Sequence, residues 1–370
     1  MRRMFISALV FILSFLLNTF AQTSTGAPQQ ASSVFNPNIS VVTDILGAFG
    51  SDPTLPDQAF NLNEAEVGFQ SVVDPYWRAD IFIGYHPAEE AVEIEEAYFT
   101  WLTTPLGLQA KIGKFRSNFG KFNLIHPPET GLADRPLSAL NFLGEEGLSS
   151  TGLSLSWLLP IPDLYLKLIG EVTTLWDKAP AFSTLETDST GAEELAASEE
   201  KEDLGYLGRL ETYLDLSEAM NLTWGGRFAT SINHPDEQIW TRLWGADLTF
   251  RWKNPRRAVY HSLTWRTEVL YNDREIPAGG KNVRTWGGFS LLDWQFSKRW
   301  HLGGRFDYSE FTEVENLNEK GGLGYITFTP SEFSLVSLQG RYVKRADGTE
   351  ETAGFVKLTF NIGPHGAHPF

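Results

Sequence analysis

The most regular feature of this chain is an alternation of apolar and polar residues with a period of two. From residue 39 onward, apolar side chains fall at every second position in segments of about nine to thirteen residues, and turn residues separate the segments. In one such segment, Leu164, Leu166 and Leu168 alternate with Tyr165 and Lys167. Successive side chains of a β-strand point to opposite faces, so the pattern predicts strands with one apolar and one polar face.

Sixteen segments of this kind can be marked along the chain. They cover residues 39–49, 62–73, 76–86, 91–103, 106–115, 150–159, 163–174, 204–216, 219–231, 241–253, 257–271, 283–296, 299–310, 321–329, 332–343 and 352–362. The connections alternate between tight turns and mostly longer polar segments. Short turns at one rim and long loops at the other, with an even strand number, predict an all-β fold: a transmembrane antiparallel β-barrel of about sixteen strands with short periplasmic turns and longer extracellular loops.

A closed sheet explains why such a pattern can cross a membrane. Hydrocarbon offers no hydrogen-bond partners, so a sheet spans it only by closing on itself, and nine to eleven tilted residues per strand are enough. Trp and Tyr often stand near the ends of the segments, where amphipathic rings suit the headgroup level. The alternative is a soluble β-sandwich with the apolar face inside, which periodicity alone does not separate from a barrel.

The first residues of the chain have the character of an export signal. Arg2 and Arg3 precede an apolar stretch, and Thr19 and Ala21 supply small residues before Gln22. We therefore expect residues 1–21 to be a signal peptide, 22–38 a periplasmic N-terminal segment and 39–370 the outer-membrane β-barrel. An uncleaved anchor is the alternative. The expected location is the outer membrane of a Gram-negative bacterium.

Several short sequences resemble a known family. They are residues 36–42 (NPNISVV), 74–80 (DPYWRAD), 95–99 (EEAYF), 112–120 (IGKFRSNFG) and 150–155 (STGLSL). These are similar to Gram-negative porin-like barrels and, in the last two, to the phosphate-selective porin O and P superfamily. The terminal Phe370 resembles the aromatic residue read by the barrel-assembly machinery. The resemblance implies a channel without catalytic residues.

Composition and charge restrict the kinds of partner that the chain can bind. The formal net charge of −16 argues against nucleic acid as a partner, and the absence of cysteine removes disulfides and thiol catalysis. The expected surroundings are outer-membrane lipid and lipopolysaccharide, with small hydrophilic solutes inside. The sequence leaves open whether the barrel is a monomer or a homo-oligomer.

The alternate face of the strands carries charges of both signs. We expect the pore to be lined by Glu64, Glu66, Arg78, Asp80, Glu93, Lys111, Arg227, Arg251, Arg266, Arg305, Arg341 and Lys357. Further acids predicted on this face include Glu95, Glu171, Asp247 and Glu268. A basic residue facing lipid at mid-membrane would cost about 2–4 kcal/mol, so the charged face is the wet one. A phosphate-selective pore needs a ladder of Arg and Lys, whereas this lumen is mixed, so general diffusion of small solutes fits it better.

The longest connection, residues 116–149, is a candidate constriction loop. It carries Arg116, Lys121, Asp134 and Arg135. A long connection without regular structure is more often functional than idle, and we expect it to enter the barrel and narrow it, held by its basic residues against the acids of the first four strands. The alternative is an ordinary surface loop.

Other chemistry is not supported by the sequence. His365 and His368 stand three apart without an evident third ligand, so no metal site or cofactor is expected. His261 and Ser262 are adjacent on a predicted strand and face opposite sides, so they cannot form a catalytic pair. The expected function is an outer-membrane porin for passive diffusion of small hydrophilic solutes or ions, and not an enzyme. The alternatives are an energy-coupled receptor or transport component and, less favoured, an outer-membrane enzyme.

Overall fold

The computed structural model describes residues 37–363 except 54, 56–57, 88–89, 188–192, 199 and 258. The chain divides into two units, Met1–Ser33 and Val34–Phe370. Only the second unit lies among the described residues. The expected signal peptide and the terminal Phe370 lie outside them, and those predictions stand as they were.

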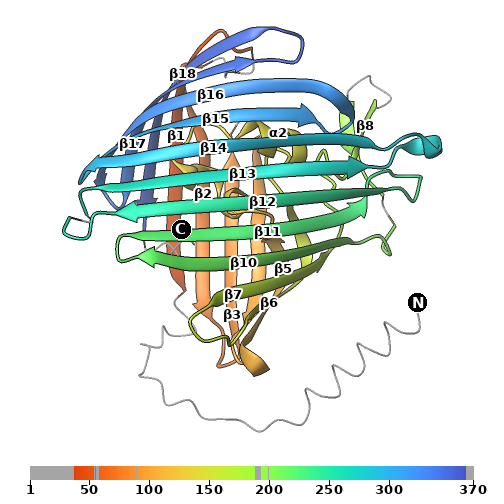
Figure 1. Cartoon of the computed structure of the whole chain (residues 1–370), viewed down its shortest axis with the longest axis horizontal. Helices are drawn as coiled ribbons and strands as arrows, with labels where there is room; N and C mark the ends of the chain where they lie inside the picture. The colour runs from red at the N-terminus through yellow and green to blue at the C-terminus, as the bar shows by residue number, and fades with distance from the viewer. Residues whose placement is uncertain are drawn as a thin grey trace. The chain divides into compact units, whose positions relative to one another are not determined.

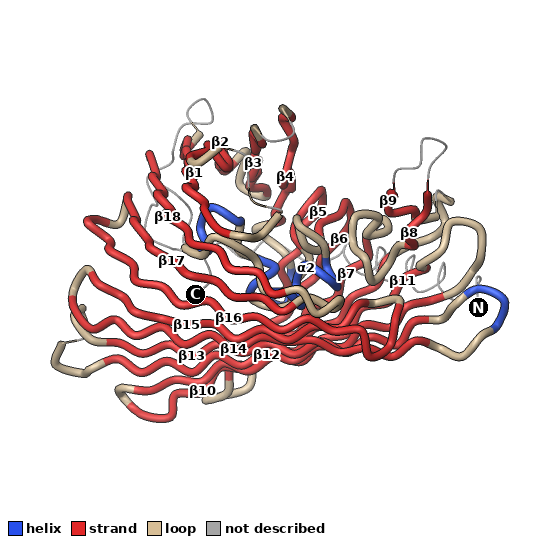
Figure 2. The backbone as a smooth tube through the Cα atoms, turned by 90° about the horizontal axis from the view of Figure 1, so that it is seen from above, coloured by secondary structure: helices blue, strands red, loops and turns tan. Residues whose placement is uncertain are grey.

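The second unit is a closed antiparallel barrel of sixteen strands (Figures 1 and 2). The strands are β1 (Asn38–Gly50), β2 (Phe60–Val72), β3 (Trp77–His86), β4 (Ala91–Trp101), β5 (Leu108–Arg116), β6 (Ser149–Leu158), β7 (Tyr165–Thr173), β10 (Gly205–Ser217), β11 (Met220–Ile232), β12 (Trp240–Lys253), β13 (Ser262–Arg274), β14 (Val283–Ser297), β15 (Trp300–Phe311), β16 (Val314–Ser331), β17 (Ser334–Lys344) and β18 (Glu350–Ile362). Each strand pairs with its neighbour in the chain, and β1 pairs with β18 to close the sheet.

The predicted fold class is therefore confirmed, and each predicted segment corresponds to one strand of the barrel. The largest differences are at β13 and β16. Residues 259 and 260 lie in a turn instead of at the start of β13, and the Tyr260 and His261 amides donate to the Arg257 carbonyl. β16 begins at Val314, seven residues before the predicted start. Its first seven residues are mostly polar and show no apolar–polar alternation, so the pattern did not mark them.

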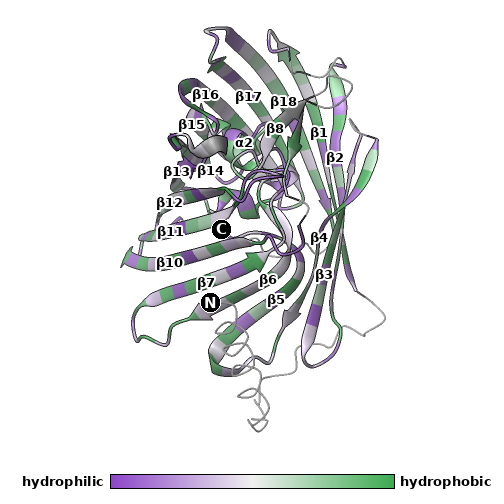
Figure 3. Cartoon of the chain, turned by 90° about the vertical axis from the view of Figure 1, so that its right-hand side faces the viewer, coloured by the Kyte–Doolittle hydropathy of each residue, from purple (hydrophilic) through white to green (hydrophobic). Residues whose placement is uncertain are grey.

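The two faces of the wall differ as the alternation requires. On β11, Thr223, Arg227 and Ser231 are buried inside the barrel, whereas Trp224 on the other face is 41% exposed. Figure 3 shows the same change of hydropathy along the strands, as green and purple bands that alternate within one ribbon. Exposed Leu, Val, Ile, Phe, Trp and Tyr side chains thus cover the outer face, as a lipid-facing wall requires.

Two irregularities change the direction of side chains in the first strands. The β1–β2 register shifts after Asp44, which leaves Asn63 as an extra residue in β2. The β3–β4 register shifts between Phe82 and Ile83, which leaves Glu95 as an extra residue in β4. A bulge of this kind bends the strand and can send two successive side chains to one face.

The connection between β5 and β6, residues 117–148, contains short helical segments and lies against the inside of the wall. They are η2 (Phe122–Leu124), η3 (Pro127–Thr130) and α2 (Leu137–Leu143), and α2 packs on β14, β15 and β16 (Figure 2). We call residues 117–148 the interior loop. None of the helices among the described residues is long and apolar enough to span a bilayer.

The connection between β7 and β10 also contributes to the interior. It contains a two-stranded sheet that the sequence did not predict, β8 (Thr184–Thr187) and β9 (Glu193–Ala196). Its first part places Trp176, Ala181 and Phe182 in the buried core, where they pack with residues of the interior loop. Figure 1 shows β8 near the end of the strands where the long connections emerge.

Candidate functional site: the barrel interior

Apolar side chains of the interior loop pack on apolar residues of the inner wall. Phe122, Leu132 and Ala139 of the loop form one cluster with residues from β14 and β16, namely Phe289, Leu291, Leu323 and Tyr325. A second cluster joins Phe119, Phe142 and Leu148 of the loop to inward residues of β10, β11, β12 and β13. The loop is therefore part of the barrel's core on the side of β10–β16.

Charged side chains also anchor the loop to β15, β17 and β18. The Asp134 carboxylate pairs with Arg305 on β15 and with Arg341 on β17, each at 2.9 Å. Lys357 on β18 donates to the Leu132 carbonyl at 2.9 Å and pairs with Asp44 at 2.9 Å. These contacts come from strands far apart in the sequence, so they fix the loop across the interior and not only at its ends.

His126 forms the third anchor, and it stands among three carboxylates. Its Nδ1 lies 2.7 Å from Glu66 and 2.8 Å from Glu95, and its Nε2 lies 2.8 Å from Glu96. Since carboxylates contact both ring nitrogens, the charged imidazolium, which can donate from both, suits this position. Burial by itself and the nearby Arg116 lower the pKa of His126, but its hydrogen bonds to the three glutamates outweigh them and raise that pKa well above its usual value.

The bulge in β4 creates this cluster. Glu95 and Glu96 are adjacent, so a regular strand would send only one of them inward, yet both contact His126. Arg116 adds a further contact, because its Nη2 lies 3.0 Å from Glu95 and its backbone amide donates to Glu96 at 3.0 Å. The residues at the start and near the middle of the loop are thus tied to one place on β4.

The four charged residues named on the loop from the sequence behave differently from one another. Arg116 and Asp134 do anchor it. Contrary to the prediction, Lys121 and Arg135 form no ion pair with acids of the first four strands among the described residues. Arg135 is buried and lies over the Phe122 ring at 5.5 Å, with no hydrogen-bond partner for its guanidinium among the described residues. Lys121 faces a cavity, and burial lowers its pKa.

A chain of ion pairs runs along the inner wall beneath the loop. Arg209 pairs with Asp247 at 2.6 Å, Asp247 with Arg227 at 2.7 Å, and Arg227 with Glu268 at 2.7 Å. The other oxygen of Glu268 accepts the Phe122 amide at 2.9 Å. These charges are almost fully buried, so they hold wall and loop together and do not face an open passage.

A polar cavity of about 820 Å³ remains on the other side of the interior. Residues of β1–β7, β10 and β11 form its wall, and loop residues including Asn118, Lys121 and His126 close it at one side. Its charged lining residues are Glu66, Arg78, Glu96, Lys111, Arg116, Lys121, His126, Glu129, Lys167 and Glu211. The cavity therefore carries charges of both signs.

Three lysines in this cavity differ from its other charged residues. Among the described residues, Lys111, Lys121 and Lys167 form no ion pair, whereas Arg78 pairs with Asp80 and Arg116 with Glu95. Lys111 lies over the Tyr98 ring at 4.3 Å. With His126 charged, six basic residues line the cavity against four acidic ones, so the charge of its lining is positive.

The predicted pore-lining residues fall into three groups. Arg78, Lys111 and Glu66 line the cavity. Glu64, Asp80, Arg227, Arg305 and Lys357 are turned inward but are nearly fully buried in pairs or clusters. The remaining four are Glu93, Arg251, Arg266 and Arg341. Glu93 pairs with Lys178 and Arg341 pairs with Asp134, each on a connection between strands. Arg251 and Arg266 are partly exposed on the inner face.

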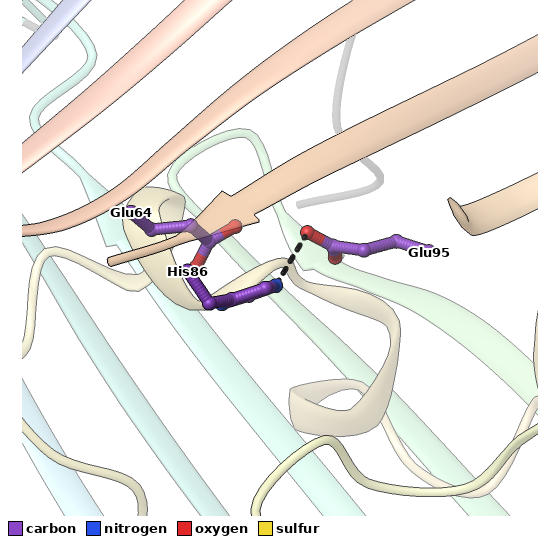
Figure 4. A group of neighbouring side chains, drawn as sticks. All are labelled: Glu64, His86 and Glu95. Atoms are coloured by element: carbon purple, nitrogen blue, oxygen red, sulfur yellow. Dashed lines mark ion pairs between the residues drawn. The ribbon is translucent and has the colours of Figure 1, made fainter. Parts of the chain in front are cut away.

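Of the residues that gather around Glu95, the sequence did not point to His86, His126 or Glu96. His126 was in view only as part of a long loop, and Glu96 has the parity of an outward residue. The one available signal was a histidine followed by two prolines in a chain with seven histidines. The structure also brings together two groups with the donor atoms of a metal site, Glu64, His86 and Glu95 (Figure 4), and Glu66, Glu95 and His126. No metal site was predicted here.

Comparison with solved structures supports the barrel fold. No family model matches the chain. Among solved structures, it is similar to an anion-selective porin from Comamonas acidovorans, with a TM-score of 0.58 and 9% identity over 88% of this chain and 99% of that one. It is also similar to OprB of Pseudomonas putida (TM-score 0.56, 9% identity, 88% and 94% covered) and to the outer-membrane channel DcaP of Acinetobacter baumannii (0.53, 10%, 88% and 96%).

The chain also has a relative in sequence. A protein of Aquifex aeolicus (strain VF5), described as uncharacterized, is 30% identical over 341 residues, which covers 85% of this chain and 70% of the relative. The solved structures share the fold at low identity, and the resemblance to the phosphate-selective porin O and P superfamily stays a prediction. The chain belongs to the family of this Aquifex aeolicus protein, and it has the closed sixteen-stranded barrel of the outer-membrane porins.

Proposed function

We propose that this protein is a channel of the Gram-negative outer membrane that lets small hydrophilic solutes or ions diffuse passively. The observation that carries the proposal is the polar cavity of about 820 Å³ inside a closed barrel whose outer face is apolar. A buried polar space of this size has no role in packing, whereas a water-filled lumen is what a porin needs.

The interior loop narrows the passage through the barrel. It packs on the β10–β16 side and leaves the cavity on the other, so solutes pass between the loop and the wall of β1–β7. Narrow, charge-lined passages favour small polar solutes and reject large or apolar ones. We therefore expect low conductance for a sixteen-stranded barrel.

The three lysines without ion pairs determine whether the channel prefers anions or cations. Fixed positive charge raises the local concentration of anions in a confined space. Lys111, Lys121 and Lys167 thus favour small anions, although the chain as a whole is acidic. The preference is for charge and not for one anion, since the lysines do not form a continuous ladder.

Single-channel recording of the purified protein in a planar bilayer tests the proposal. We expect steps of small conductance and a reversal potential in a KCl gradient that shows chloride preference, strongest at low salt, where screening is weakest. Liposome swelling with small sugars should report passive uptake without an energy source. A protein that inserts and never conducts is not a channel, and the proposal then fails.

A further inference from the structure

Three side chains from neighbouring strands converge near the end of β3. Glu64 on β2, His86 at the end of β3 and Glu95 in the β4 bulge bring one oxygen, one ring nitrogen and one oxygen within 4.8 Å of one another (Figure 4). His86 Nε2 lies 3.8 Å from Glu95 Oε1. Two atoms bound to one zinc ion at about 2.1 Å lie about 3.4 Å apart, so a small inward movement brings these groups to ligand positions.

Unsatisfied oxygens point into this space. Glu64 is 2% exposed, and its Oε1 has no hydrogen-bond partner among the described residues. Glu95 Oε1 is likewise buried without one. Buried carboxylate oxygens are normally hydrogen-bonded or bound to a cation. Figure 4 shows the Glu64 and Glu95 carboxylates turned toward each other and toward the His86 ring.

The surroundings orient Glu95 for this role. Its other oxygen, Oε2, is held by Arg116 at 3.0 Å and by His126 at 2.8 Å, which leaves Oε1 for the space beside His86. Outer groups that fix one oxygen of a ligating carboxylate are a regular feature of metal sites. Gly84 makes the room, because a methyl group there would overlap both Glu95 Oε1 and His86 Nε2.

The acidic groups around this space outnumber the basic groups in contact with them. Four carboxylates meet here, those of Glu64, Glu66, Glu95 and Glu96, and the cations in direct contact with them are Arg116 and the imidazolium of His126. A bound cation would balance this excess of carboxyl groups. The second group of possible ligands, Glu66, Glu95 and His126, is less suitable, since both nitrogens of His126 are already in hydrogen-bond contact with carboxylates.

We propose that Glu64, His86 and Glu95 bind one divalent transition-metal ion of the zinc class, joining β2, β3 and β4 near the rim that carries the β3–β4 connection. One imidazole and two carboxylates suit zinc better than calcium or magnesium, which prefer oxygen ligands alone. The His86 side chain is 28% exposed, so the ion has a way in and water can take the fourth position. This site is independent of the proposed channel function.

The test uses the full chain in detergent, with His365 and His368 changed to alanine in every sample so that these two residues cannot bind the probe. After EDTA treatment and its removal, zinc chloride is titrated by calorimetry, and bound zinc is measured by mass spectrometry after gel filtration. We expect one zinc per chain and a melting temperature that rises with zinc. Calcium chloride should give neither.

The matched variants are His86→Ala and His301→Ala. His301 also lies on a strand, pairs with one carboxylate and is 26% exposed at its side chain, but it has no second carboxylate beside it among the described metal-ligand groups. Loss of an outer-shell group costs about 10–100-fold in affinity, so loss of His86 should cost about 100-fold or more, while His301→Ala binds like its parent. Glu64→Gln and Gly84→Ala should also lose zinc while keeping the β-rich circular dichroism of the barrel.

Three results would overturn the proposal. The parent chain could bind no zinc, calcium could compete equally with zinc, or His86→Ala and His301→Ala could lose the same amount of zinc. The last result would mean that exposed histidines bind the ion without a built site.

Discussion

The His126 ring nitrogen Nε2 lies 2.8 Å from the Glu96 carboxylate, although these residues come from the interior loop and from the wall. The contact depends on the extra residue at Glu95, which turns Glu96 inward. The bulge and the loop therefore act together. The wall supplies a group of carboxylates, the loop supplies one cation, and together they hold the loop inside the barrel.

Replacing His126 should loosen the interior loop. His126→Ala leaves three inward carboxylates without their cation, and breaking a buried pair in this way costs about 3–5 kcal/mol. We expect a lower melting temperature and larger fluctuations of single-channel current. His126→Gln, which keeps a hydrogen-bond donor, should lose less. Measurements in EDTA separate this effect from metal binding, and a melting temperature equal to that of the parent would show that the loop does not depend on His126.

The barrel could be predicted from the sequence because its physical cause is local. Each strand must put apolar residues toward lipid and polar residues inward, and a period of two records this within one segment. β16 marks the limit of that signal: from Val314 to Lys320 five of the seven residues are polar and do not alternate with apolar ones, and the pattern appears only from residue 321.

The site could not be predicted in the same way, because its causes are not local. The inward position of Glu96 depends on a bulge, and a bulge leaves no mark in a pattern of alternation. His126 meets Glu66 across sixty positions of the chain, through a loop whose course is set by packing on β14 and β16. Charged residues such as Arg227 were correctly expected on the inner face, but only the structure shows that the loop covers them.

Shortening the interior loop should widen the channel. Deletion of residues 132–143 removes α2 and Asp134, and with them the packing on Phe289 and Leu323. We expect single-channel conductance to rise about twofold or more, as the constriction sets the resistance of a narrow pore. Deletion of residues 277–280, from the β13–β14 connection, is the control and should conduct like the parent. Equal conductance of both deletion variants would place the constriction elsewhere.

Removing the cavity lysines should move the ion preference toward cations. Lys111→Gln combined with Lys167→Gln takes two uncompensated positive charges out of the cavity, which lowers the local concentration of anions. The shift of reversal potential should be largest in dilute salt. Lys344→Gln makes the same kind of change at the exposed end of β17 and should leave the preference as it is. A shift of equal size in this control would mean that net charge, and not the cavity, decides.

Anion preference should also fall at alkaline pH because of Lys121. Burial lowers the pKa of Lys121; nearby Glu211 and Asp247 oppose this shift, and Arg209 and Arg251 add to it. The side chain is charged below that pKa and neutral above it, so the preference is present at low pH and declines before an ordinary lysine, with a pKa of about 10.4, would titrate. Lys121→Arg keeps its charge throughout and should remove this part of the decline. An unchanged pH profile in that variant would assign the titration to another group.

Single cysteines can test which face of the wall is wet, because the chain has no native cysteine. Lys167 and Leu168 are neighbours on β7: Lys167 lines the cavity, and the Leu168 side chain is 38% exposed on the apolar outer face. Lys167→Cys should therefore react with a charged, membrane-impermeant maleimide in proteoliposomes, and Leu168→Cys should be protected by lipid. Unfolding in denaturant should make both thiols react alike, which controls for the chemistry of the label. If Leu168→Cys reacted faster than Lys167→Cys in the bilayer, the strand would face the other way, and the cavity could not be the passage, since a shift of one residue reverses every side chain of the strand.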